Sequence, residues 1–369
     1  MKGEPLALEH TLPSYGGRCL TEVMPGILVG VPSELIDDAV ANAPTVVLFV
    51  VDGLGWHQLR RHRTLAPTLA AASDASAPVT TVAPSTTATA LTSLTTGATP
   101  GEHGLVGYRV PTEMGLLNTL RWRAGGQDAR VAVPAAEMQP VMPFCGRPAA
   151  VVTRAEFRHS GFTAAHLRGG AIWGWSDANG LVESVRDAVG KRYPLVLAYY
   201  DNLDKIAHAF GIGAEYRSVL AEVEQLSCAL RDVLPRGVPL VVTADHGVVE
   251  VLDPPIIVDP DIVALTSGWS GEARMLWLHA RLGAAADLLD ACERYQSAAE
   301  IAPLSRVLEE RWLGRHVTEP ARGRLGDVVL VPRALQAFTM PDEDVPRHPL
   351  IGRHGGLTAE EMLVPFLVL

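Results

Sequence analysis

Three short apolar runs, each ending in acidic residues, constrain the fold of this chain most strongly. Val, Leu, Ala, Phe and Tyr dominate these runs, which read "TVVLFVVDGLGW" (45–56), "YPLVLAYYDNLD" (193–204) and "VPLVVTADHG" (238–247). Such apolar runs are typical of strands buried on both faces, as in a parallel sheet covered by helices. The carboxyl ends of parallel strands meet at one edge of the sheet, where open α/β folds bind their ligands. The sequence therefore predicts an α/β fold with a site at these strand ends.

The segments around the runs predict the rest of the architecture. Apolar residues recur at helical spacing over 215–234, and a later helical pattern covers 272–296. We expect one domain over 1–369, with a central, mostly parallel sheet sandwiched between helices. A cap segment is expected at about 110–179 and an insert subdomain at about 268–324, and these two segments are expected to decide the substrate.

Composition bears on partners and location. The chain has 369 residues, of which 48% are hydrophobic and 20% are charged, enough for a large core. The net charge of −10 argues against a nucleic-acid polymer or an anionic membrane as the main partner. We expect no signal peptide in the N-terminal "MKGEPLALEHTLPSYGG" and no transmembrane helix. The four cysteines are scattered along the chain and predict a cytoplasmic protein with free thiols; they are Cys19, Cys145, Cys228 and Cys292. The sequence does not indicate an oligomeric state.

Carboxylates and imidazoles gather at the predicted strand ends. Asp204 and His208 are four residues apart, so a helix would project both from one face toward one cation. Asp201 precedes Asp204 by three residues and is either an alternative metal ligand or a helix cap. Three carboxylates and three imidazoles suit zinc or a similar divalent ion, and six ligands favour two ions with open positions. Each residue alone has a structural alternative as a turn or loop residue. The candidates are Asp52, Asp204, His208, Asp245, His246 and His354.

A threonine-rich helix start is the second functional signal. The stretch "APSTTATALTSLTTGATPGEHGLVGY" (83–108) places many threonines in an Ala/Leu helix, although threonine is a mediocre helix former. Ser85, Thr86 or Thr87 would lie at the positive end of the helix dipole, which attracts phosphate and stabilises an alkoxide. A nearby metal ion would lower the hydroxyl pKa further. The hydroxyl group therefore acts either as a nucleophile or as an ordinary helix cap.

Five ordered motifs resemble those of the alkaline phosphatase superfamily, and within it those of the nucleotide pyrophosphatase / type I phosphodiesterase family. They span 50–358 and read "VVDGLG", "PSTTATALTSLTTGATPGEHGLVGY", "DKIAHAFG", "TADHG" and "GRHGGLT". The resemblance implies an alkaline phosphatase-like α/β fold with Thr87 as the nucleophile. It also implies two zinc ions, or another divalent metal such as Mn²⁺. One ion would be held by Asp204, His208 and His354, and the other by Asp52, Asp245 and His246, with Thr87 bridging toward it.

The resemblance also implies the reaction. We expect metal-dependent hydrolysis of a small phosphate ester, a phosphodiester or a nucleotide pyrophosphate. Tyr108 stands where many members carry an asparagine that helps to hold the phosphoryl oxygens, and a tyrosine donates a single hydrogen bond. We therefore expect Tyr108 to contact the substrate in a different geometry.

Other activities compete with this one. Phosphonoacetate hydrolase-like activity and phosphomonoesterase activity are the enzymatic alternatives. A sulfatase is disfavoured because "TTATA" lacks the arginine of the Cys/Ser-x-Pro-x-Arg segment. An inactive relative that binds a phosphorylated ligand is the alternative outside enzymes.

Overall fold

A computed structural model describes residues 10–333, 335–343 and 350–369. Residues 1–9, which belong to the stretch expected to lack a signal peptide, lie outside the described residues. Within the described part of the chain, no helix is both long enough and apolar enough to cross a membrane.

A six-stranded sheet forms the centre of the molecule, in the order β20-β10-β1-β9-β7-β8. The three predicted apolar runs supply its neighbouring strands β10, β1 and β9, which pair in parallel, and β7 continues the parallel pairing to β8. The last strand, β20, is antiparallel to β10, so the sheet is mixed. The expected α/β fold is confirmed. The strand bounds are β1 Val46–Val51, β7 Ala149–Arg154, β8 Ala171–Trp175, β9 Leu195–Tyr200, β10 Leu240–Thr243 and β20 Phe366–Val368.

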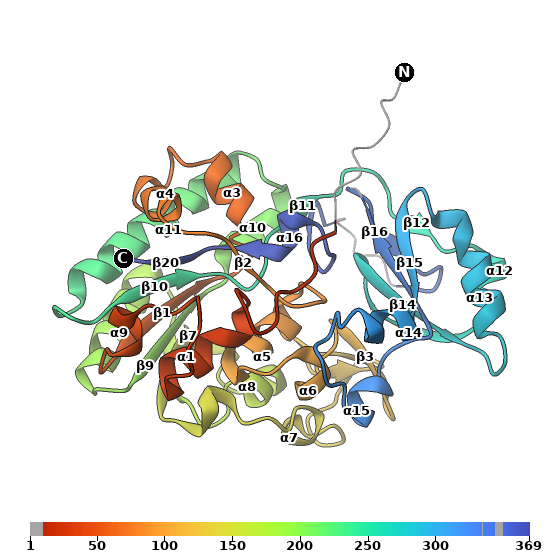
Figure 1. The fold of residues 1–369 in the computed structure, drawn as a ribbon, viewed down its shortest axis with the longest axis horizontal. Coiled ribbons are helices and arrows are strands. Elements are labelled where there is room, and N and C mark those ends of the chain that lie inside the picture. Colours follow the sequence, from red (N-terminus) through yellow and green to blue (C-terminus); the bar gives the residue numbers. More distant parts are fainter. Residues whose placement is uncertain (1–9, 334, 344–349) are drawn as a thin grey trace.

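Helices cover both faces of this sheet (Figure 1). All six residues of β1 are buried, because helices shield the strand from both sides. The helices α3, α4 and α11 lie on one side, and α1, α5 and α8 lie on the other (Figure 1). Their bounds, with those of two further helices, are α1 Val23–Val29, α3 Trp56–Arg61, α4 Pro67–Asp74, α5 Thr87–Thr96, α8 Gly161–His166, α9 Ala178–Gly190, α10 Asn202–Phe210 and α11 Ala214–Val233.

A second sheet of eight antiparallel strands lies beside the first, in the order β15-β16-β14-β13-β3-β4-β5-β6. Its two halves come from distant parts of the chain and meet where Gly271 of β13 pairs with Arg109 of β3. The strand bounds are β3 Arg109–Thr112, β4 Gly115–Asn118, β5 Arg123–Ala124, β6 Gln127–Asp128, β13 Thr266–Glu272, β14 Met275–Ala280, β15 Ala299–Pro303 and β16 Val328–Pro332.

The segment expected as a cap, 110–179, contributes to both sheets: its first part builds β3 to β6, and its last part builds β7 and β8. The helix expected over 272–296 is wrong in its first part, where β14 forms instead, and a helix begins only at α13 (Ala285–Cys292). Trp277 of β14 packs into the large core, whereas Leu276 and Leu278 pack into a smaller one. Burial on both faces makes the strand uniformly apolar, so periodicity does not separate it from a buried helix.

Short elements complete the fold. Three two-stranded ladders pair β11 with β18, β12 with β17, and β19 with β2. Their bounds are β2 Val79–Thr80, β11 Val249–Glu250, β12 Ile256–Ile257, β17 Phe338–Thr339, β18 Gly352–Arg353 and β19 Leu363–Val364. The remaining helices are α2 Asp38–Ala41, α6 Pro100–His103, α7 Ala135–Met138, α12 Pro260–Ala264, α14 Leu304–Glu309, α15 Glu319–Arg322 and α16 Ala359–Met362.

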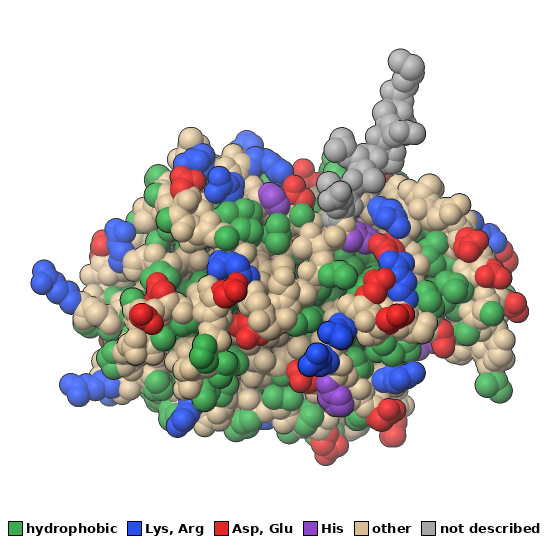
Figure 2. Space-filling model, viewed as in Figure 1, with side chains coloured by type: hydrophobic (Ala, Val, Ile, Leu, Met, Phe, Trp, Pro, Cys, Tyr) green, Lys and Arg blue, Asp and Glu red, His purple; other side chains and the backbone are tan. Residues whose placement is uncertain are grey.

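The surface carries charges of both signs. On the face shown in Figure 2, Lys and Arg side chains are scattered among acidic and apolar ones and do not merge into a continuous basic area. The site described next is instead built inside the molecule, at the carboxyl edge of the central sheet.

Candidate active site

The six predicted ligands converge in two groups of three. Asp52 directly follows β1, Asp245 and His246 follow β10, α10 carries Asp204 and His208, and His354 follows β18. In each group, one ligand atom of every residue lies within 4.8 Å of the others. The first metal group consists of Asp204, His208 and His354, and the second metal group consists of Asp52, Asp245 and His246.

The first metal group joins α10 to the loop after β18. The distance from His208 Nε2 to Asp204 Oδ2 is 3.0 Å, and that from His354 Nε2 to His208 Nε2 is 3.3 Å. The Nδ1 atom of each imidazole contacts a backbone carbonyl. His208 Nδ1 lies 2.7 Å from the Gly352 oxygen, and His354 Nδ1 lies 3.1 Å from the Ser85 oxygen. Such backbone contacts turn both Nε2 atoms toward a shared ligand.

The charges of this group are strongly coupled. Burial acts to raise the pKa of Asp204, but the imidazoles of His208 and His354 hold it below its usual range. Burial acts to lower the pKa of His208, yet the Asp204 carboxylate outweighs it and raises the pKa to about 9. Asp204 and His208 thus stabilise each other's charged forms.

The second metal group surrounds His246, which is fully buried. Its Nε2 lies 3.3 Å from Asp52 Oδ1, 3.4 Å from Asp245 Oδ2 and 3.0 Å from the hydroxyl of Thr87. The Tyr199 hydroxyl donates a hydrogen bond to Asp52 Oδ2. Burial raises the pKa of Asp52, with a further contribution from the carboxylate of Asp245, and burial raises the pKa of Asp245 itself to about 7.

Three carboxylate oxygens in these groups lack hydrogen-bond donors although they are buried: Asp52 Oδ1, Asp204 Oδ1 and Asp245 Oδ2. Unpaired anionic oxygens inside a protein are costly unless a cation compensates them. Nitrogen and oxygen donors in threes fit zinc and similar divalent ions, with room for an exogenous ligand. The residues therefore fit the two ions that the resemblance implies.

Asp201, the alternative to Asp204, belongs to neither group. Its Oδ1 accepts a hydrogen bond from Arg154 Nε at 2.7 Å, and its Oδ2 lies 2.5 Å from Lys205 Nζ. The turn after β1 allows Asp204 to approach the other metal-group residues. Gly53 has φ +74°, and a Cβ there would lie 2.9 Å from the Cβ of Asp204, so glycine lets this turn pass against α10.

Thr87 is the hydroxyl that faces the metal groups. It begins α5 and is 6% exposed, and its Oγ1 lies 3.0 Å from His246 Nε2. Thr86 is the N-cap residue, without a side-chain capping hydrogen bond. Ser85 points elsewhere, since its hydroxyl donates to the carbonyl of Gly356 at 2.7 Å. Of the three hydroxyls that the sequence leaves open, that of Thr87 lies within hydrogen-bond distance of a residue of the second metal group.

A cavity of about 720 Å³ opens onto these residues. Thr87 and both metal groups contribute to its wall, and so do Tyr108, Arg109 and Arg353, together with apolar side chains from α5 and α8. The hydroxyl of Tyr108 accepts a hydrogen bond from the amide of Asn118 at 2.6 Å, and the Arg109 guanidinium lies 5.2 Å from its ring centre. The sequence offered no signal for Asn118 or Arg109, which lie outside the five motifs. Arg353 belongs to the motif "GRHGGLT" but carries no metal-ligand chemistry that would single it out.

Glu272 is a further cavity residue that sequence reasoning missed. It ends β13 and is 8% exposed, and its Oε1 has no hydrogen-bond partner. Burial raises the pKa of Glu272 to about 8, so this carboxyl group is protonated at neutral pH. A neutral carboxyl group can donate a hydrogen bond to an anionic substrate instead of repelling it.

Glu272→Gln is expected to stabilise the protein at alkaline pH. The carboxyl group has an ordinary pKa of 4.5 in the unfolded chain and about 8 in the folded one. Its ionisation therefore favours unfolding, and the melting temperature of the variant relative to wild type should rise between these two pH values and then level off. Thermal unfolding in EDTA between pH 2 and pH 9 measures this difference and that of the control below.

Glu300→Gln is the matched control with the opposite sign. A hydrogen bond from His10 lowers the pKa of Glu300 to about 2, so its charged form stabilises the fold. This variant should be destabilised at neutral pH, and the loss should fade in acid as the pH falls below 4.5. A pH-independent effect of Glu272→Gln would contradict the protonated state of Glu272.

Comparison with known proteins places these features in a family context. The model of the type I phosphodiesterase / nucleotide pyrophosphatase family matches residues 46–357. No curated protein matches the chain by sequence. Among solved structures, an inactive threonine-to-alanine variant of murine ectonucleotide pyrophosphatase/phosphodiesterase 5 in complex with AMP is similar, with 16% identity, a TM-score of 0.63, and coverage of 88% of this chain and 87% of that one.

Two other solved structures share the fold. The human ectonucleotide pyrophosphatase/phosphodiesterase 5 is 16% identical, with a TM-score of 0.64 over 88% of this chain and 87% of that one. Phosphonoacetate hydrolase from Sinorhizobium meliloti, in complex with phosphonoacetate, is 17% identical, with a TM-score of 0.62 over 88% of this chain and 89% of that one. At these identities the likeness concerns the fold.

Proposed function

Because the chain belongs to the type I phosphodiesterase / nucleotide pyrophosphatase family, we propose that it hydrolyses phosphodiester or nucleotide pyrophosphate bonds with Thr87 as the nucleophile. One observation carries the proposal: the Thr87 hydroxyl lies 3.0 Å from His246, beside three buried carboxylate oxygens that have no hydrogen-bond donor. Divalent cations, in our proposal two zinc ions, would be held by the two metal groups, lower the pKa of the attacking hydroxyl and offset charge on the phosphoryl oxygens.

The chain's own residues account for positioning and bond making. Thr87 Oγ1 gives its proton to solvent and forms the new bond to phosphorus, while the bond from phosphorus to the leaving oxygen breaks and that oxygen takes up a proton from solvent. Water then releases the phosphoryl group and regenerates the threonine. The N-terminus of α5 points its dipole at the same place and favours the anionic group. Tyr108 and Arg353 line the cavity and are proposed to contact the substrate.

Two of the similar structures support one substrate class each. The mouse structure is that of an inactive variant, with a threonine replaced by alanine, and holds AMP; this supports a threonine nucleophile and a nucleotide substrate here. The bacterial protein holds phosphonoacetate, which supports the phosphonate alternative. We propose that the antiparallel sheet acts as the cap that selects between them, because β3 and β13 border the cavity through Arg109 and Glu272.

A substrate panel tests the proposal. Protein stripped with EDTA and reloaded with Zn²⁺ or Mn²⁺ is assayed on bis(p-nitrophenyl) phosphate, ATP, p-nitrophenyl phosphate and phosphonoacetate. We expect the highest kcat/KM on the diester or on ATP, no turnover in EDTA, and recovery with metal. Fastest turnover of phosphonoacetate or of the monoester would replace the proposed substrate class. Full metal loading with no turnover of any compound would indicate the inactive, ligand-binding relative.

A further inference from the structure

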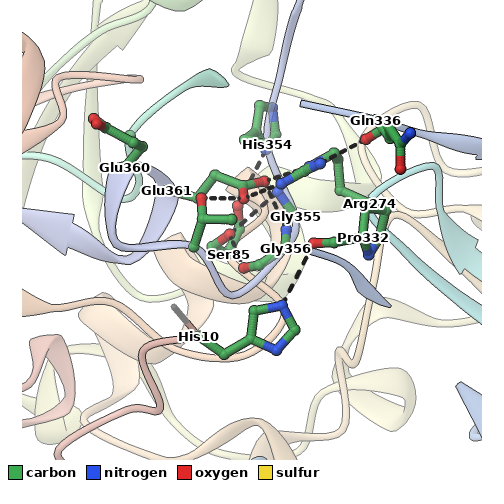
Figure 3. Close-up of polar contacts among 12 residues, drawn as sticks. His10, Ser85, Arg274, Pro332, Gln336, His354, Gly355, Gly356, Glu360 and Glu361 are labelled. Atoms are coloured by element: carbon green, nitrogen blue, oxygen red, sulfur yellow. Dashed lines mark hydrogen bonds and ion pairs between the residues drawn. The ribbon is translucent and has the colours of Figure 1, made fainter. Parts of the chain in front are cut away.

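A fully buried ion pair connects the second sheet to the C-terminal part of the chain. Arg274 lies in the turn between β13 and β14, and Glu361 lies on α16 (Figure 3). The guanidinium binds the carboxylate with two hydrogen bonds, 2.9 Å from Nε to Oε1 and 2.6 Å from Nη2 to Oε2. Both side chains are 0% exposed. Such a two-point contact fixes the orientation of both groups.

The Glu361 carboxylate also holds the loop that follows His354. It accepts hydrogen bonds from the backbone N–H of Gly356 at 2.9 Å and from the Thr358 hydroxyl at 2.6 Å. A Cβ at Gly356 would lie 2.7 Å from Glu361 Oε2, so only glycine allows this close approach. The loop is therefore fixed against Glu361 two residues beyond His354.

Ser85 links the same loop to the nucleophile. Its hydroxyl accepts a hydrogen bond from Gly355 N–H at 3.2 Å and donates one to the carbonyl of Gly356 at 2.7 Å. Its own carbonyl lies 3.1 Å from His354 Nδ1 (Figure 3). Because Ser85 precedes Thr87 by two residues, one network holds both His354 and the start of α5.

His354 depends on this network more than its partners do. Asp204 and His208 share one helical turn, whereas His354 approaches from another segment, and its Nε2 is 3.9 Å from Asp204 Oδ1. Hydrogen bonds behind a metal ligand fix its orientation, and their loss weakens metal binding by about 10- to 100-fold.

We propose that Arg274 and Glu361 are positioning residues that hold His354 in the first metal group, so that the second sheet controls the affinity of one of the two ions. The inference rests on the proposed function for the presence of the ions. Its readout is metal affinity instead of turnover. An inactive wild-type protein that binds two ions would therefore count against the proposed function alone.

The decisive variant replaces both charges together, Arg274→Met with Glu361→Leu, because an apolar pair can take the place of a buried ion pair without loss of stability. Glu361→Gln is the milder companion. Zn²⁺ affinity is measured by competition with a chromophoric chelator, and the visible spectrum of the Co²⁺ form reports the ligand geometry. We expect one of the two ions to bind about 10- to 100-fold more weakly, with the other unchanged.

Glu224→Gln provides the control, since Glu224 is a buried carboxylate on α11 that accepts hydrogen bonds from the backbone N–H groups of Thr68 and Leu69 on α4. It should bind both ions as the wild type does. The proposal is overturned if the folded double variant keeps wild-type affinity for both ions and an unchanged Co²⁺ spectrum. Equal weakening of both ions would also overturn it, because the pair would then act on general stability.

Discussion

Thr87→Ala is expected to lower kcat by at least about 10⁴-fold, because removal of a nucleophile leaves only binding and electrostatic stabilisation. The methyl group that remains keeps the first turn of α5, so both metal groups should keep their ions. The measurement is kcat on the best substrate of the panel, together with the zinc content of the purified variant.

Two neighbouring substitutions make this result specific. Thr87→Ser keeps a hydroxyl group at the same place and should retain measurable turnover. Thr92→Ala removes another buried threonine of the same helix, whose hydroxyl donates to the Ala88 carbonyl at 2.7 Å, and should leave kcat near that of the wild type. Wild-type rates in Thr87→Ala would show that another group attacks phosphorus.

Asp245→Asn is expected to abolish binding of the ion in the second metal group. Asp245 is 0% exposed, and its free Oδ2 faces His246, so the amide removes an anionic donor at the centre of the group. Loss of a direct ligand should weaken binding by more than the roughly 100-fold reported for residues behind the ligands, and kcat should fall with it. Elemental analysis after equilibration in micromolar zinc measures the stoichiometry.

The same variant has an effect without metal. Because burial raises the pKa of Asp245 to about 7, the wild-type carboxylate destabilises the metal-free fold at higher pH. In EDTA at pH 9, Asp245→Asn should therefore melt at a higher temperature than the wild type. Addition of zinc should raise the melting temperature of the variant by less than that of the wild type. Asp201→Asn is the control, since Asp201 pairs with Arg154 and Lys205. Loss of zinc from Asp201→Asn with full zinc in Asp245→Asn would contradict the assignment.

The sequence predicted the middle of the fold because the relevant information is local. The runs at 45–56, 193–204 and 238–247 are apolar throughout, so they specified three neighbouring strands and the edge on which the acidic residues collect. The family resemblance is confirmed over residues 46–357. The second sheet escaped prediction because β13 pairs with β3 across more than a hundred residues, and no local pattern encodes that contact.

The residues of the site that the sequence does not predict were missed for the same reason: their roles depend on contacts between distant segments. Glu272 and Arg274 are ordinary charged residues in the sequence, and they stood in a segment that was expected to be helical. Their roles arise only when the chain around the turn between β13 and β14 packs against the His354 loop, through Glu272, and against α16, through Arg274. The spacing of four residues between Asp204 and His208 favours Asp204 over Asp201 as the ligand, and Asp204 lies 3.0 Å from that imidazole in the structure.

β14 lends its alternate side chains to two different cores, with Trp277 on one side and Leu276 and Leu278 on the other. Such a strand belongs to the packing of both parts of the molecule, so the antiparallel sheet is not a separate module. Exchanging the antiparallel sheet between relatives, as a means of transplanting substrate preference, would strip an apolar face from the catalytic half. We therefore expect substrate specificity to change more readily through single substitutions on the cavity wall than through exchange of whole segments.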